Sequence, residues 1–256
     1  MRGAQSNARP SPKKKEDTLM YATWLGQAGM LFETESGLRI MVDPYLSDSL
    51  AERGPAMKRL TPIDERFLDL DIDVLVLSHD HGDHTDLETL KRVLAQEKSV
   101  DVLASYNAWE KVRFALPPQH NYTMFNAGTE WTRDGVTLRA VPAIHNDFRA
   151  IGLVFEADGL SVYVTGDTLY DKRLVADMTT EKIDCFFPVI NGKGNNMNPA
   201  DAVRMTKQLA PKWAYPLHWD TFVNYTADPV DFTEPLAGSG TEAAVMEQYV
   251  SIKLGK

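Results

Sequence analysis

The sequence has almost no cysteine. Cys185 is the only one among 256 residues, so no intrachain disulfide can form in this sequence and a cysteine-based zinc knuckle is excluded. Cys185 lies in the apolar run 184–187. We therefore expect a buried strand residue there rather than a reactive thiol.

Basic residues are also few. The chain has 27 Lys and Arg against 36 Asp and Glu, a formal net charge of −9. This balance argues against an extended nucleic-acid surface or an anionic-membrane footprint, because both need many cations that neutralise phosphates. The overall charge does not exclude a local basic pocket. Residues 1–19 are locally basic, with Lys13, Lys14 and Lys15 in succession, and they lack the apolar core of a signal peptide, so we expect a flexible tail.

Long apolar runs are missing as well. No stretch approaches the roughly 20 apolar residues that a membrane-spanning helix needs, so the sequence predicts no membrane span and, by default, a cytoplasmic protein. Its composition leaves assembly into a homo-oligomer open.

The residues that are present predict one folded unit. Hydrophobic residues make up 43% and charged residues 25%, which is typical of globular domains, and the length suits a single domain over 20–256. Short apolar runs broken by glycine predict strands at 21–25, 30–32, 38–42, 74–77, 102–104, 122–125, 136–141, 151–156, 161–165, 185–188 and 213–216. Helices are predicted at 62–68, 86–95, 106–114, 170–178, 199–209 and 242–250, the second because Thr85 and Glu88 have capping-box spacing. Two strand-rich halves closed by helices favour a layered α/β (α+β) sandwich.

Histidines and carboxylates are concentrated directly after the apolar run 74–77. The segment reads Ser78-His79-Asp80-His81-Gly82-Asp83-His84. Imidazole nitrogens and carboxylate oxygens are the ligands of borderline and hard divalent metals. One loop histidine is usually just a polar residue, but three of them within six positions predict a metal site.

Three more potential ligands follow predicted strands. They are His145, Asp167 and His218, and sites commonly assemble from loops at strand ends. The remaining histidine, His120, follows Pro117-Pro118-Gln119 and fits no ligand position, so we expect a surface loop residue.

The order and spacing of these seven residues resemble the metal-binding signature of the metallo-β-lactamase-fold hydrolases over about residues 20–225. The resemblance implies a four-layer αββα sandwich with the site along one edge of its paired sheets. It further implies one metal at His79, His81 and His145, a second at Asp83, His84 and His218, and Asp167 bridging the two.

Four further segments are similar to the L-ascorbate-6-phosphate lactonase-like branch of that superfamily. They are 24–29, 42–47, 166–168 and 216–222. With 194–202, the same segments resemble uncharacterised metal-dependent hydrolases of this branch. The resemblance implies a lactonase-like hydrolase.

The ligand types predict hydrolysis by a metal-activated water or hydroxide, since divalent ions lower the pKa of bound water. The expected catalytic residues are Asp83, Asp167 and His218, with Asp83 either orienting the water or serving only as a ligand. Asp43 either fixes the histidine loop or caps a strand end. One or two divalent ions are expected. Zinc is favoured, with manganese and iron as alternatives. The oxygen-reducing di-iron relatives resemble one another in having glutamate at the position of His81, so a histidine there disfavours redox chemistry.

Substrate contacts are expected from a polar loop before a predicted helix. Its residues Asn191, Lys193, Asn195 and Asn196 suit a phosphate or carboxylate, although such a loop can equally satisfy only its own backbone. Three residues next to strand ends are expected to line the cleft unless they are core residues: Tyr45, Trp219 and Asp220.

The predicted function is hydrolysis of a small polar substrate, with a lactone or other cyclic ester favoured. Two alternatives remain: a phosphodiesterase acting on a nucleotide or phospholipid head group, and a non-catalytic metal-binding regulatory protein. The complete ligand set favours an enzyme, because a binding module has no need for a full water-activating site.

Overall fold

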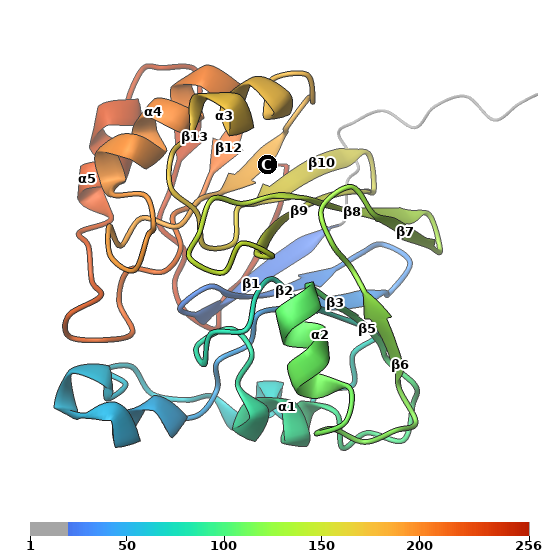
Figure 1. Cartoon of the computed structure of the whole chain (residues 1–256). Coiled ribbons are helices and arrows are strands. Elements are labelled where there is room, and N and C mark those ends of the chain that lie inside the picture. The colour runs from blue at the N-terminus through green and yellow to red at the C-terminus, as the bar shows by residue number, and fades with distance from the viewer. Residues whose placement is uncertain (1–19, 256) are drawn as a thin grey trace, which may run out of the picture.

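Two seven-stranded sheets pack face to face in this computed structural model, which describes residues 20–255 (Figure 1). In the first sheet the order is β14-β1-β2-β3-β4-β5-β6. Its strands are β1 (Tyr21–Gly26), β2 (Gly29–Glu33), β3 (Arg39–Val42), β4 (Val74–Leu77), β5 (Asp101–Ala104), β6 (Asn121–Met124) and β14 (Ser251–Lys253). The predicted tail at 1–19 lies outside the described residues.

The second sheet has the order β13-β12-β11-β10-β9-β8-β7. Its strands are β7 (Glu130–Arg133), β8 (Val136–Pro142), β9 (Ile151–Ala157), β10 (Leu160–Val164), β11 (Cys185–Phe187), β12 (Trp213–Ala214) and β13 (Glu242–Ala243). Both sheets are mixed: β1 to β3 pair antiparallel and β3 to β6 parallel, while β7 to β10 pair antiparallel and β10 to β13 parallel.

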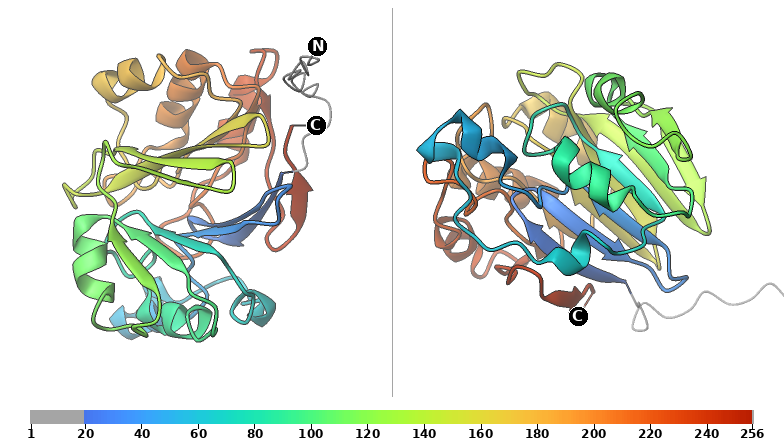
Figure 2. Two further views of the ribbon diagram at one scale, coloured as in Figure 1. Left: turned by 90° about the vertical axis from the view of Figure 1, so that its right-hand side faces the viewer. Right: turned by 90° about the horizontal axis from the view of Figure 1, so that it is seen from below.

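Helices cover the two outer faces. On the first sheet lie α1 (Leu87–Val93) and α2 (Tyr106–Val112), and on the second lie α3 (Lys172–Met178), α4 (Pro199–Leu209) and α5 (Val230–Thr233) (Figure 2). Short 3₁₀ segments occur at Ser49–Arg53, Pro55–Met57, Glu65–Phe67 and Glu234–Leu236. The predicted αββα sandwich is confirmed.

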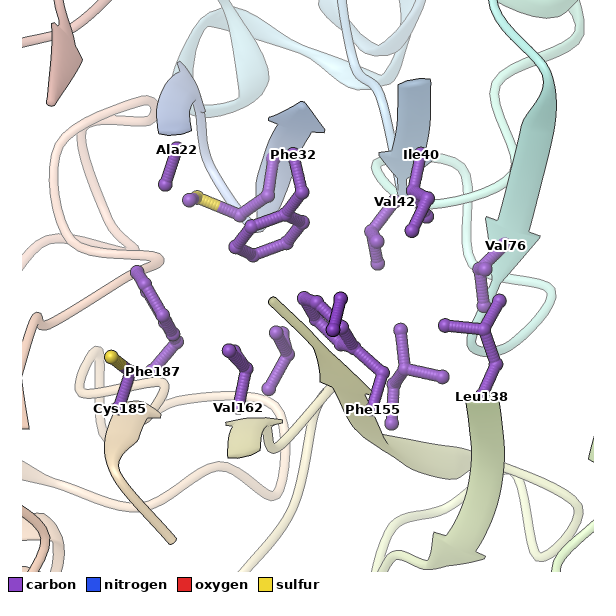
Figure 3. Packing of buried hydrophobic residues seen from close by; sticks show 14 of the residues in the cluster. Ala22, Phe32, Ile40, Val42, Val76, Leu138, Phe155, Val162, Cys185 and Phe187 are labelled. Carbon is purple, nitrogen blue, oxygen red and sulfur yellow. The ribbon is translucent and has the colours of Figure 1, made fainter. Parts of the chain in front are cut away.

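The main core lies between the sheets. Alternate side chains of each strand point inward, and Phe32 meets the rings of Phe155 and Phe187 edge-on at centroid distances of 4.8 and 5.6 Å (Figure 3). Cys185 is fully buried in this layer, as predicted. Such burial fixes which face of each strand is inward, and hence where each strand end points.

Three local predictions were wrong. Residues 242–250 are not helical, because Glu242 and Ala243 pair in parallel with β12 and sheet pairing overrides helix propensity. The helix after the histidine cluster begins at Leu87, and its cap is Asp86, whose carboxylate accepts from the N–H groups of residues 88 and 89. In the region predicted as a helix at 62–68, only a short 3₁₀ turn forms, Glu65–Phe67.

His120 is buried rather than on the surface. Only 5% of it is exposed, its Nδ1 accepts from Val100 N at 3.2 Å, and its Nε2 donates to Leu94 O at 2.8 Å. This histidine therefore joins the end of α1 to β5, which is a structural role.

Across residues 20–255, none of the helices combines the length and the apolar character needed to cross a membrane.

The two sheets are joined at the edge where β4, β8, β10 and β12 end. Ile151 N donates to Ser78 O at 3.1 Å, and His218 N donates to Gln27 O at 2.9 Å. Gly166, with φ of +58°, lies so close to the Ile151 carbonyl that any Cβ would collide with it. Glycine is therefore required where the sheets approach, and the loops that follow these strands share one small volume.

Candidate metal centre

The histidine loop between β4 and α1 is held from both sides. Thr85 Oγ1 donates to His79 O at 2.6 Å, and Lys111 Nζ, from α2, donates to the carbonyls of Asp80 and Thr85 at 2.9 and 2.7 Å. Burial lowers the pKa of Lys111. The sequence motif thus becomes a fixed turn, because its own carbonyls are satisfied by groups outside it.

Seven ligand residues predicted from the sequence come together in two clusters. The first is His79, His81, His145 and Asp167, and the second is Asp83, His84 and His218; within each cluster the ligand atoms all lie within 4.8 Å of one another. Their roles as ligands remain predictions, but their positions are those that the resemblance implies.

Asp167 lies between the clusters and turns one oxygen toward each. Oδ2 is 4.0 Å from Nε2 of both His79 and His145. Oδ1 is 3.3 Å from His84 Nε2 and 3.4 Å from His218 Nε2. A single carboxylate can therefore serve two cations at once, as the bridging prediction requires.

Buried ligand atoms here have no hydrogen-bonding partner among the described residues. They include His79 Nε2, His84 Nε2 and Asp167 Oδ1; the last two are close, at 3.3 Å, without the alignment of a hydrogen bond. Unpartnered buried polar atoms are rare and costly in folded proteins. Convergent nitrogen and oxygen donors of this kind fit zinc, manganese or iron, so the residues present fit the expected ions.

Asp43 orients two of the histidines. Its Oδ1 accepts from Ser78 N at 2.7 Å, and its Oδ2 accepts from the Ser78 hydroxyl and from His84 Nδ1, the latter at 2.8 Å. Ser78 Oγ lies 3.0 Å from His79 Nδ1, so the hydroxyl can accept from that ring while donating to Asp43. Both rings then keep their protons on Nδ1 and present Nε2 to the centre. Of the two sequence alternatives for Asp43, these contacts favour the one in which it fixes the histidine loop.

His145 is oriented by backbone and loop contacts. Its Nδ1 lies 3.3 Å from Asn195 O, and its Nε2 lies 3.3 Å from His81 Nδ1. Asp147 stabilises this loop by accepting from Asn107 Nδ2 at 2.7 Å and Arg149 N at 2.8 Å. A hydrogen bond from Nδ1 to the Asn195 carbonyl keeps the ring proton on Nδ1 and makes Nε2 the nitrogen that can bind a cation.

Gln27 is a site residue that sequence reasoning missed. It is fully buried in the turn between β1 and β2, where its Nε2 donates to Asp83 Oδ2 at 2.7 Å and lies 3.1 Å from His218 Nε2. Its φ of +52° is unusual for a residue that is not glycine. A polar residue between two glycines, Gly26 and Gly29, was the available signal.

Charges at the centre shift its ionisable groups in opposite directions. Burial lowers the pKa of His79 well below its usual value. Burial would also lower the pKa of His84 and His218, but the carboxylates of Asp167 and Asp83 outweigh it and raise both. Burial opposes ionisation of Asp167, yet the histidines around it hold its pKa well below the usual value. The carboxylates of the second cluster therefore favour the protonated form of its two imidazoles, so a cation that binds there competes with protons.

A cavity of about 220 Å³ opens beside these clusters. The metal centre and the histidine loop contribute His81, Gly82, Asp83, Asp167 and His218 to its wall, and the loop after β11 contributes Asn191, Lys193, Gly194 and Asn196. The two 3₁₀ segments at 49–57 add Leu50, Arg53 and Met57, and the remaining wall residues are Asn146, Phe222 and Tyr225. Three of the expected substrate contacts, Asn191, Lys193 and Asn196, are on this wall. Arg53 was missed, because nothing in its local sequence connects it with a histidine loop about 30 residues later.

Four expected substrate contacts are not part of this wall. Tyr45 is fully buried and packs against Phe222. Trp219 stacks on Trp24 with centroids 5.1 Å apart. Asn195 meets the site through its backbone oxygen only, and Asp220 accepts from Thr221.

Comparison with known proteins now identifies the family. Residues 38–219 match the model of the beta-lactamase superfamily domain. The chain belongs to the metallo-beta-lactamase superfamily. Within it, the chain is similar to proteins named "UPF0173 metal-dependent hydrolase": 25% identity to one from Sulfurisphaera tokodaii, covering 90% of this chain and 98% of that one, and 28% to one from Pyrococcus furiosus, covering 92% and 100%.

Solved structures of the superfamily share the fold. Igni18, a metallo hydrolase from Ignicoccus hospitalis, superposes with a TM-score of 0.74 at 22% identity and covers 93% of this chain and all of its own. At this identity the likeness concerns the fold alone.

Proposed function

We propose that the protein is a metal-dependent hydrolase of small polar substrates, with a lactone or other cyclic ester favoured. The observation that carries the proposal is the pair of ligand clusters that share Asp167, which faces one cluster with each oxygen. Relatives named metal-dependent hydrolases support it. A complete ligand set with an adjacent cavity is the arrangement that a hydrolytic site needs.

The chain's own residues have distinct tasks in this proposal. His79, His81 and His145 would hold one divalent ion and Asp83, His84 and His218 a second, with Asp167 shared. Ions held there would supply Lewis acidity and a water of lowered pKa.

In this proposal Asp83 would orient the attacking water by accepting a hydrogen bond from it. Its side chain is 17% exposed and lies on the cavity wall. Burial opposes its ionisation, but His84 and His218 lower its pKa, so it is a carboxylate at neutral pH and can accept a hydrogen bond. Gln27 fixes its Oδ2, which leaves the carboxylate oriented when substrate enters.

Metal analysis and a hydrolysis screen test this function. Protein loaded with zinc, manganese or iron would be offered lactones, thioesters, carboxylic esters, phosphodiesters and phosphate monoesters, each with and without chelator. We expect chelator-sensitive turnover that is highest on lactones or carboxylic esters. Highest turnover on phosphodiesters would favour the phosphodiesterase alternative, and failure of the loaded protein to hydrolyse any class would contradict the proposal.

Variants locate the activity. His81→Ala and Asp167→Asn should lower turnover at least 100-fold and lower the bound metal, because each removes a ligand group. His120→Gln is the matched histidine control, since both ring nitrogens of His120 are bonded to backbone groups, of Val100 and Leu94, and not to residues of the metal centre. Folded Asp167→Asn protein with unchanged metal content and activity would refute the assignment.

A further inference from the structure

Cations on the cavity wall have no ionic partner. Among residues 20–255, neither Arg53 nor Lys193 forms a salt bridge, although the chain carries a net charge of −9. The carboxylates of this wall are Asp83 and Asp167, and both face histidines of the metal centre. The remaining charged side chains of the wall are therefore positive, which favours an anionic occupant.

Asn191 gives an independent sign of a ligand. Its side chain is on the cavity wall and only 4% of the residue is exposed. Neither Oδ1 nor Nδ2 has a hydrogen-bond partner among residues 20–255. Leaving a buried amide unpaired is costly. An unpaired side-chain amide on the wall of a cavity therefore indicates that a ligand in the cavity forms the missing hydrogen bonds.

Arg53 and Lys193 approach the cavity from separate segments. Arg53 ends the 3₁₀ segment Ser49–Arg53, and its Nη2 lies 3.8 Å from the position that a Cβ on Gly82 would occupy. The guanidinium is therefore next to the histidine loop. Lys193 follows Asn191 by two residues in the loop after β11, so an ammonium and an unpaired amide come from one short stretch.

One side of the same cavity is apolar. Leu50, Met57, Phe222 and Tyr225 contribute to its wall and belong to one packed cluster. Tyr225 also lies beside the polar loop, because its Cε1 is 3.8 Å from the position that a Cβ on Gly194 would occupy. With about 220 Å³, the cavity is smaller than the roughly 300 Å³ at the lower end for drug-sized ligands.

We propose that Asn191, Lys193 and Arg53 form a subsite for an oxyanion group of the substrate, a carboxylate or a phosphate, which is separate from the bond that is hydrolysed. The proposal rests on the proposed hydrolase function and narrows its substrate class to small anionic esters or lactones with an apolar portion. The apolar portion lies against Met57 and Tyr225, the partly exposed members of the apolar cluster. Lys193 and Arg53 hold the oxyanion, and the Asn191 amide donates to it.

Equilibrium binding of small probes tests the subsite without turnover. Benzoate and phenylphosphonate supply the two oxyanions with an apolar ring, and benzamide is the neutral match. Each is titrated calorimetrically into metal-loaded and chelator-treated protein. We expect both oxyanions to bind at least 3-fold more tightly than benzamide in both forms, and the tighter of the two identifies carboxylate or phosphate as the natural group. Equal binding of benzamide would overturn the proposal.

Matched variants assign the binding to these residues. Lys193→Gln and Arg53→Gln should each weaken oxyanion binding about 3- to 10-fold, since both cations are exposed and exposed pairs contribute modestly. Lys207→Gln and Lys58→Gln remove the same charge from exposed positions outside the cavity wall and should leave binding within 2-fold. Equal losses of oxyanion affinity in the control and test variants would show that the effect comes from net charge alone and would refute the subsite.

Asn191→Leu separates a ligand role from a structural one. Because the amide is buried without a partner, its replacement by an apolar side chain of similar size should raise the unfolding temperature while weakening oxyanion binding. A variant that is less stable and binds both oxyanions normally would contradict the role given to Asn191.

Kinetics distinguish failure of the subsite from failure of the hydrolase. The ratio of kcat/KM for mono-p-nitrophenyl succinate to that for neutral p-nitrophenyl butyrate should fall about 3- to 10-fold in Lys193→Gln. Turnover with an unchanged ratio in both Gln variants refutes the subsite and leaves the hydrolase. Absence of any hydrolysis, together with oxyanion binding that depends on Lys193 and Arg53, refutes the hydrolase and supports the subsite.

Discussion

Asp43→Asn tests how the histidines of the metal centre are oriented. The carboxylate accepts from Ser78 N at 2.7 Å, from the Ser78 hydroxyl and from His84 Nδ1 at 2.8 Å. Asparagine has the same shape and tolerates the left-handed backbone found here, with φ of +43°. If its oxygen keeps the bond to Ser78 N, its NH₂ group faces His84 Nδ1. That nitrogen must then accept, so the ring proton moves to Nε2, the atom that points into the second cluster.

The expected loss can be worked out from that one contact. A hydrogen bond to a charged group contributes about 1.5–3 kcal/mol, and about 1.4 kcal/mol corresponds to a factor of ten in affinity. We therefore expect Asp43→Asn to weaken binding at the cluster of Asp83, His84 and His218 about 10- to 100-fold. This is the range in which partners of metal ligands generally act.

Competition between the protein and a chromogenic chelator, titrated with zinc, measures the change. Asp73→Asn is the control, because Asp73 is also buried but pairs with Lys98 and Arg39 N away from the centre. Asp43→Asn protein that folds and binds two equivalents of zinc as tightly as the wild type would refute the tautomer argument.

Three further outcomes are expected. Gln27→Ala removes the 2.7 Å hydrogen bond to Asp83 and should weaken binding at the same cluster by about 2 kcal/mol; unchanged chelator competition would contradict this. Zinc binding near pH 7 should release protons, because the nearby carboxylates outweigh burial and raise the pKa of His84 and His218 in the metal-free protein. Zinc affinity should then rise as the pH increases through those raised pKa values. Calorimetric heats of zinc binding that do not depend on the ionisation heat of the buffer would rule out this proton release. His120→Ala leaves a buried N–H and a buried carbonyl unpaired and should lower the free energy of unfolding by about 3 kcal/mol with metal content unchanged, as measured by urea denaturation.

The metal ligands could be predicted from the sequence for a physical reason. His79 to His84 follow a strand whose residues are all buried, so its end is rigid and the motif is local. His145, Asp167 and His218 also follow strands of the second sheet, and the ends of these strands meet the first sheet at one edge. Each ligand carries its own local signal, a buried strand that stops at a polar residue.

Contacts formed across long sequence separations could not be predicted. Gln27 meets His218 from 191 positions away, and no pattern around residue 27 specifies that distance. Tyr45 follows a strand as the ligands do, but its ring turns into the packed cluster with Phe222, so the core alternative left open by the sequence describes its position. The helix predicted at 242–250 was wrong because two of its residues pair with β12, and such pairing depends on the sheet rather than on local propensity.

Chemistry and substrate choice are carried by different parts of this molecule. The ligand atoms project from strand ends that the two sheets hold together, with backbone bonds such as Ile151 N to Ser78 O. The proposed oxyanion subsite comes from the 3₁₀ segment ending at Arg53 and the loop containing Asn191 and Lys193, neither of which supplies a proposed metal ligand. Loops that do not hold the sheets together can change their side chains at little cost in stability. We therefore expect substitutions at Arg53 and Lys193 to alter which substrate is accepted while leaving metal affinity and the unfolding temperature close to those of the wild type.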